Sequence, residues 1–321
     1  MSGLFTALLG AAAQGVLWGI MVLGVYITYK LLDIADLTVD GSFALGGCVC
    51  AVMILNFHMD PVAAIVVSAF AGVLAGAVTG LLHTLFEIPA ILAGILTQIG
   101  LWSINLRIMG GKSNNPLLQE ETLISRLVGR TGTKTVETAS PLVQKLGLTQ
   151  SQASLVIGII IAILVVAALY WFFGTEIGSA LRATGNNENM IRALGVNTKM
   201  TKLLALMLSN GLVGLSGALV CQSQKYADVG MGTGAIVIGL AAIVIGEVLL
   251  GRFRHFAWKL SSAVIGSVVY FLIRAIVLQM GMDPNDMKLL SAIIVALALC
   301  IPVAVNKWKM RQAYSDEGGE E

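Results

Sequence analysis

The sequence has few charged residues: 12% of its 321 residues are Asp, Glu, Lys or Arg, whereas 57% are hydrophobic. A soluble globular domain has about 25% charged and roughly 45–50% apolar residues, and a disordered chain is more polar still. The mean hydropathy of +0.86 applies to the whole chain. The composition therefore excludes both classes and indicates that many residues face lipid. The net charge of +2 gives no reason to expect a nucleic-acid partner.

Residues that often carry chemistry are also scarce. The sequence contains no Gly-x-Ser-x-Gly, no His-Glu-x-x-His and no phosphate-binding Gly-x-x-x-x-Gly-Lys-[Ser/Thr] motif. The histidines are scattered, and the cysteines lie in apolar runs without disulfide or zinc spacing. These residues are His58, His83 and His255, and Cys48, Cys50, Cys221 and Cys300. We therefore expect no catalytic set, metal site or cofactor, and no ATP bound by this chain.

Long apolar runs dominate what is present. At about 20 residues per crossing, the length allows eight to ten transmembrane helices, so the predicted fold class is an all-α polytopic membrane protein. Apolar runs cover residues 4–29, 43–56, 61–82, 88–108, 153–173, 203–221, 236–250, 261–278 and 289–305.

Two of these runs, residues 43–56 and 236–250, are short for a full crossing. Each follows a polar stretch interrupted by glycine, at residues 40–42 and 230–234. Broken helices are tolerated in a membrane where protein or a cavity shields the backbone, and in transporters they mark the pathway. Discontinuous helices are therefore expected at both places.

Two polar segments, residues 110–152 and 174–202, flank one apolar run and so face opposite sides of the membrane. Counting spans backwards puts residues 252–259 and the basic tail at Lys307, Lys309 and Arg311 on the side of residues 174–202. The positive-inside rule then makes that side, with the C-terminus, cytoplasmic. Five basic residues in the external loop 110–152 oppose this choice.

The expected organisation is one membrane domain, residues 1–309, and a cytoplasmic tail, residues 310–321.

Glycine stripes run along two spans. Gly72, Gly76 and Gly80 repeat every four residues, and the second stripe, Gly211, Gly214 and Gly217, repeats every three. Such stripes let helix backbones approach closely. Packing within the chain and a subunit interface both explain them.

Acidic residues cluster where the first span ends, at Asp33, Asp36 and Asp40. They either line the cytoplasmic part of a solute path or cap helices in a solvated loop, and Asp40 and Ser42 suit caps of the following helix. The candidate pathway residues are Asp36, Thr38, Asp40, Ser42 and Phe43.

Two other charged groups near span ends have predicted roles. Arg274 lies near an external span end, where it suits a subunit contact or substrate steering. Glu247, close to Arg252 and Arg254, suits either an ion pair at the interface or a snorkelling contact.

Residues 178–197 fit a short amphipathic helix, with Asn186 or Asn187 at its start and Gly195 at its end. Such a helix at the membrane face is either a docking surface for a soluble partner or an ordinary loop.

This segment resembles the coupling-helix loop of ATP-binding cassette (ABC) importer permeases of the branched-chain amino acid and sugar type. The family has Arg-Ala, a polar gap and Ala-x-x-x-Gly-Ile-Asn. Here Arg182-Ala183 and Asn186-Asn187 match, Ala193 lies two residues before Gly195, and Val196-Asn197 has Val for Ile. The stretch Asp36-Leu-Thr-Val-Asp40-Gly-Ser-Phe43 resembles a subgroup of amino-acid permeases paired with lipoprotein receptors associated with tryptophan or tyrosine.

The resemblance implies a non-catalytic permease subunit in a bacterial cytoplasmic membrane. Its implied partners are a pair of ATPase subunits, an external substrate-binding lipoprotein, and a second copy or close paralogue of the chain. The implied ATPase-coupling residues are Arg182, Ala183, Asn186, Asn187, Glu188, Arg192, Ala193, Gly195, Val196 and Asn197. The solute is expected to be an amino acid, with nucleosides and sugars as alternatives. An ion-driven secondary transporter and a membrane enzyme are the other classes to distinguish.

Overall fold

The computed structural model describes residues 2–131, 134–135, 149–250, 255–283, 286, 289, 291–297 and 300. The expected tail, residues 310–321, lies outside these residues, as do Arg252, Arg254 and the later part of the ninth apolar run.

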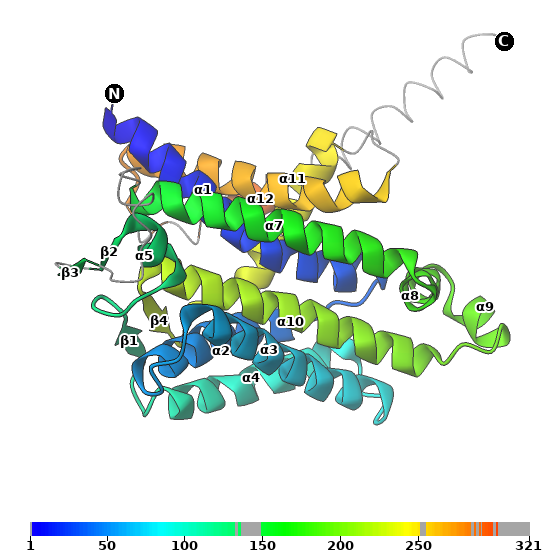
Figure 1. Cartoon of the computed structure of the whole chain (residues 1–321). Helices are drawn as coiled ribbons and strands as arrows, with labels where there is room; N and C mark the ends of the chain where they lie inside the picture. Colours follow the sequence, from blue (N-terminus) through cyan, green and yellow to red (C-terminus); the bar gives the residue numbers. More distant parts are fainter. Residues whose placement is uncertain are drawn as a thin grey trace, which may run out of the picture.

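The chain folds as a bundle of long helices that run roughly parallel or antiparallel to one another (Figure 1). Among the described residues, seven helices are long and apolar enough to cross a membrane, by length and composition. The all-α class is therefore confirmed. The long helices are α1 (Ser2–Tyr26, continued by the π-helix η1, Ile27–Leu31), α2 (Thr38–Leu55), α3 (Pro61–Thr84), α4 (Ala90–Ile108), α7 (Gln150–Gly174), α10 (Thr198–Gln224) and α12 (Phe256–Gln279).

Short elements gather at the two ends of the bundle. Helix α5 (Leu123–Val128) and strands β1 (Asn114–Pro116), β2 (Arg130–Thr131), β3 (Lys134–Thr135) and β4 (Tyr226–Asp228) lie at one end. Strand β1 pairs antiparallel with β4, and β2 with β3. Helices α8 (Glu176–Asn186) and α9 (Glu188–Ala193) lie at the other end (Figure 1). The described parts of the two polar segments therefore lie at opposite ends, as the sequence predicts.

Helix α10 packs closely against α2 and α3 through glycine. A Cβ on Gly72 or Gly76 would lie 2.2 or 2.3 Å from a backbone oxygen of α10, at Asn210 and Leu206 respectively. A Cβ on Gly217 would lie 2.0 Å from the backbone oxygen of Phe43 in α2. The glycine stripes thus pack against each other's helices within one chain, which decides between the two explanations of the stripes.

The first expected helix break is wrong. Residues 40–42 are inside α2, which begins at Thr38 with Leu37 as its N-cap residue. The Asp36 carboxylate accepts a hydrogen bond from the Thr38 backbone N–H at 2.9 Å, which satisfies one of the free donors at the start of this helix. Neither Asp40 nor Ser42 caps α2. The second break is correct: residues 230–234 form turns before the short helix α11 (Ala235–Leu250).

Candidate functional site

Two short helices, α8 and α9, and the turn that leads into α10 lie at one end of the bundle. Asn187 caps α9, since its Oδ1 accepts a hydrogen bond from the Met190 backbone N–H at 3.0 Å. Gly195 has φ +86°, a left-handed conformation that glycine adopts without steric cost. Asn197 caps α10 by accepting from the Met200 backbone N–H at 3.2 Å. The structure has two short helices, α8 and α9, where the sequence predicts one; the predicted start at Asn187 and the predicted end at Gly195 are those of α9.

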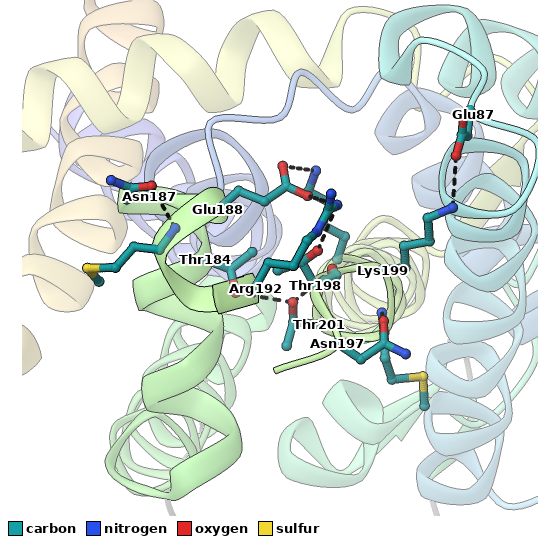
Figure 2. A network of polar contacts seen from close by, with 12 residues as sticks. Glu87, Thr184, Asn187, Glu188, Arg192, Asn197, Thr198, Lys199 and Thr201 are labelled. Carbon is teal, nitrogen blue, oxygen red and sulfur yellow. Dashed lines mark hydrogen bonds and ion pairs between the residues drawn. The ribbon is translucent and has the colours of Figure 1, made fainter. Parts of the chain in front are cut away.

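Ion pairs hold α9 against α10. Glu188 accepts from Lys202 Nζ at 2.6 Å and from Arg192 Nη2 at 3.3 Å. The same Arg192 nitrogen lies 3.4 Å from the Thr198 hydroxyl. Figure 2 shows Glu188, Arg192 and Thr198 facing one another between the two helices. These contacts fix the position of α9 relative to a long helix of the bundle.

A second ion pair links the same face to α3 and α4. Lys199 Nζ lies 2.9 Å from Glu87, which sits in the turn between those helices with φ +56° (Figure 2). The hydrogen bond from Lys199 lowers the pKa of Glu87, and the hydrogen bond from Lys202 lowers the pKa of Glu188. Both carboxylates are therefore charged at neutral pH.

The outer face of this segment exposes apolar side chains. Met190, Leu194 and Met200 are 51%, 72% and 50% exposed. Asn186, Ala193 and Asn197 are exposed as well, and Ala183 and Val196 are half-buried. Flexible exposed Met side chains suit an adaptable contact with another protein, and a cluster of exposed apolar side chains is typical of an interaction surface.

Arg182 contacts a different helix from Arg192. Its guanidinium carbon lies 5.0 Å from the centre of the Phe256 ring, at the start of α12. Its Nε is buried and has no hydrogen-bond partner among the described atoms. Arg182 thus joins α8 to α12 by a cation–π contact, whereas Arg192 lies on the exposed side.

The candidate pathway residues form two separate groups. Asp36, Thr38 and Ser42 belong to a buried network. Asp36 Oδ2 accepts from Asn210 Nδ2 at 2.7 Å, and Asn210 Oδ1 accepts from the Ser42 hydroxyl at 2.7 Å. The Thr38 hydroxyl lies 2.7 Å from that of Thr79. Burial raises the pKa of Asp36 above its ordinary value, and the hydrogen bonds from Thr38 and Asn210 offset part of this rise.

Sequence reasoning missed three members of this network. Asn210 lies on α10, Thr79 on α3 and Thr97 on α4, and the Thr79 hydroxyl donates to that of Thr97 at 2.9 Å. The sequence does carry a signal for these residues: each is a polar residue within an apolar run, and such a residue needs a hydrogen-bond partner in the interior. All three are buried, so the network joins four helices.

Asp40 and Phe43 lie apart from this network. The Asp40 carboxylate accepts from the backbone N–H groups of Gly234 and Ile236, both at 2.9 Å, and so caps α11. The fully buried Phe43 ring lies 4.5 Å from that of Trp18. Asp40 therefore contacts the turn of the second helix break, and Phe43 lines a cavity beside that turn.

Glu247 forms an ion pair with η1: its carboxylate lies 3.0 Å from Lys30 Nζ. The predicted partners Arg252 and Arg254 lie outside the described residues. Within the described chain, His, Cys, Asp and Glu side chains form no group of three or more that could hold a metal ion.

Known proteins match this chain over most of its length. The model of the family described as "Branched-chain amino acid transport system / permease component" matches residues 7–300. A tyrosine transport system permease protein of Clostridioides difficile is 38% identical over 92% of this chain and 90% of its own.

More distant relatives carry other names. A probable branched-chain amino acid transport permease of Methanocaldococcus jannaschii is 25% identical over 81% of this chain and 76% of its own. The ribose import permease of Escherichia coli K12 is 23% identical over 83% and 76%. The family match covers both ends of the bundle and the α8–α9 segment, and this chain therefore belongs to the family of permease components of branched-chain amino acid transport systems.

Proposed function

We propose that the chain forms the solute path of an ATP-driven importer and that α9 is the surface on which a separate ATPase subunit docks. The observation that carries this proposal is the position of α9. It is an exposed helix at one end of the bundle, clamped to α10 by Glu188 and Lys202. A movement of α9 would therefore also move α10, which packs against α1, α2 and α3.

The end bearing α8 and α9 is then cytoplasmic, and the end bearing β1 and β4 receives solute from an external binding protein. The C-terminus is cytoplasmic in this arrangement, and the membrane is the bacterial cytoplasmic membrane. Two ATPase subunits act on two permease chains, which are either two copies or a copy and a paralogue. Residues 1–309 act as one membrane domain.

The proposed solute is an amino acid with an aromatic side chain. The tyrosine transport permease shares 38% identity with this chain, whereas the ribose permease shares 23%. The resemblance of residues 36–43 to permeases associated with tryptophan or tyrosine receptors supports the same class. Nucleosides and sugars are less well supported by these identities.

Site-directed cross-linking tests the docking surface. A variant with Cys300 replaced by Ser receives one new cysteine at Leu194, because the other three cysteines are buried. The matched control carries its cysteine at Leu118, which is 64% exposed and lies two residues after β1, a strand at the opposite end of the bundle. Each variant is labelled with a benzophenone maleimide in native membranes and irradiated. We expect the Leu194 site to capture a P-loop ATPase and the Leu118 site not to do so. Capture at neither site, or equally at both, contradicts the proposal.

A further inference from the structure

A cavity of about 460 Å³ opens at the end of the bundle that bears β4. Its walls come from α1, α2, α10, β4, α11 and α12 and from residues 291–292. This volume lies within the range of small-molecule sites, about 300–1,000 Å³. The cavity lies beside the turn at residues 230–234, where the second helix break was predicted.

The cavity wall combines aromatic and apolar surface with a few polar groups. Trp18, Phe43, Tyr226 and Met231 supply aromatic rings and a thioether. The polar groups are the Arg274 guanidinium and the side chains of Gln224, Thr233 and Ser291. No Asp or Glu is among the described lining residues, so the wall has a net positive charge. A wall of this kind suits a molecule that has an apolar body and one carboxylate.

Arg274 is the cationic group of this wall. Its guanidinium carbon lies 5.8 Å from the centre of the Phe271 ring on its own helix. No carboxylate of the described residues forms an ion pair with it. An ionisable group inside a membrane helix is costly unless it has a partner or lines a cavity. Arg274 does line the cavity, and guanidinium binds carboxylate in a two-pronged geometry.

Trp18 provides a second, independent observation. Its side chain lines the cavity and is only 8% exposed, yet its indole Nε1–H donates to no described acceptor. Buried polar groups without a partner are uncommon and call for a specific explanation, such as an absent ligand or water. An occupant with hydrogen-bond acceptors supplies that explanation.

We propose that this cavity is a binding site for the transported amino acid itself, in which Arg274 binds the α-carboxylate and the ring surfaces of Trp18 and Phe43 contact an aromatic side chain. This inference rests on the proposed function. The amide oxygen of Gln224 is an acceptor for the ammonium group. The chain would then select its solute directly, in addition to any selection by an external receptor.

Equilibrium binding to the full-length chain in lipid nanodiscs tests this site. The probes are radiolabelled L-tyrosine and tyramine, which lacks the carboxylate. The variants are Arg274→Gln, which removes the charge, and Val237→Trp, which fills the cavity from a side chain that is 39% exposed. The matched control is Arg107→Gln, an exposed arginine at the same end of the bundle that is not among the lining residues.

We expect L-tyrosine to bind the wild type and the Arg107→Gln control equally. Tyramine binding to the wild type, and L-tyrosine binding to either cavity variant, should be at least tenfold weaker. Failure of the wild type to bind L-tyrosine overturns the inference, as does equal binding of tyramine or unchanged affinity in Arg274→Gln. Because this assay contains no ATPase, its failure is distinguishable from failure of the proposed importer function, which the cross-linking test examines separately.

Discussion

Asn210 is the residue through which α10 holds the start of α2. It donates to Asp36 and accepts from Ser42, and all three side chains are buried. Asn210→Leu leaves the Asp36 carboxylate without this donor in the interior, which should cost about 3 kcal/mol of unfolding free energy.

Thermal unfolding in detergent checks this expectation. Ser42→Ala removes one neutral hydrogen bond and should cost about 1 kcal/mol. The control Ser262→Ala removes a hydroxyl that donates to Lys259 of its own helix and should shift the melting temperature least. Equal melting temperatures for Asn210→Leu and Ser262→Ala would contradict the role of the network.

Glu188 makes the attachment of α9 dependent on pH. Its pKa is lowered in the folded chain, first by the hydrogen bond from Lys202. A carboxyl with a lowered folded pKa contributes stability above its unfolded pKa, which is about 4.3, and loses it as the pH falls through the folded value. Hydrogen-exchange protection of α9 should therefore decrease below about pH 4.

The variant Glu188→Gln should imitate this loss at neutral pH. Glu176→Gln is the matched control, because Glu176 is exposed and forms no salt bridge with a described residue. Protection of α9 that is the same in wild type and Glu188→Gln would show that the ion pair does not hold the helix.

At the scale of elements, α9 depends on the backbone conformation of Gly195. A Cβ there would meet nothing within 4 Å, so the cost of substitution is conformational. Gly195→Val places a β-branched residue at φ +86°, which costs about 1–2 kcal/mol and shifts the end of α9. We expect ATP hydrolysis by the assembled transporter to continue while uptake falls severalfold.

Gly174→Val is the matched control for this variant. Gly174 also has open space around its Cβ position, but it ends α7 and does not have positive φ. The measurement is the number of solute molecules moved per ATP hydrolysed in proteoliposomes. If both variants retain the wild-type ratio, the assignment of α9 to coupling is wrong.

Helix α11 depends on a carboxylate from another helix. Asp40 accepts from the backbone N–H groups of Gly234, which precedes α11, and of Ile236 in its first turn. Loss of a capping side chain costs about 0.5–2 kcal/mol. Asp40→Ala should therefore reduce hydrogen-exchange protection in the first turn of α11, and Asp40→Asn should reduce it less. Equal protection in wild type and Asp40→Ala would contradict the capping role.

The sequence predicts some of these elements well and others poorly, for physical reasons. The short helix α9 follows from local signals, since Asn187 and Gly195 act within one turn of it. The prediction that Asp40 caps α2 fails because the hydrogen-bond partners of Asp40 lie nearly 200 positions away, in and before α11. The cation–π contact of Arg182 with Phe256 is likewise a tertiary contact that no local pattern contains.

At the scale of the whole molecule, α10 connects the candidate sites. Its first turns pair with α9, its middle holds Asn210 against α2, and its last turns contribute Val220 and Gln224 to the cavity. Glycine contacts with α2 and α3 leave little free space along this path. Movement of α9 should therefore move α10, and the cavity with it, as one packed unit.

The most direct test of the account is the energy source of transport. The chain is purified from native membranes with the proteins that remain bound, reconstituted into proteoliposomes with the receptor, and assayed for uptake of radiolabelled L-tyrosine. ATP on the α9 side and an imposed proton or sodium gradient are supplied separately. The account predicts uptake that requires ATP and a stoichiometric ATPase, and that does not respond to a gradient alone. Uptake by the isolated chain, driven by a gradient without ATP, would contradict it and identify a secondary transporter.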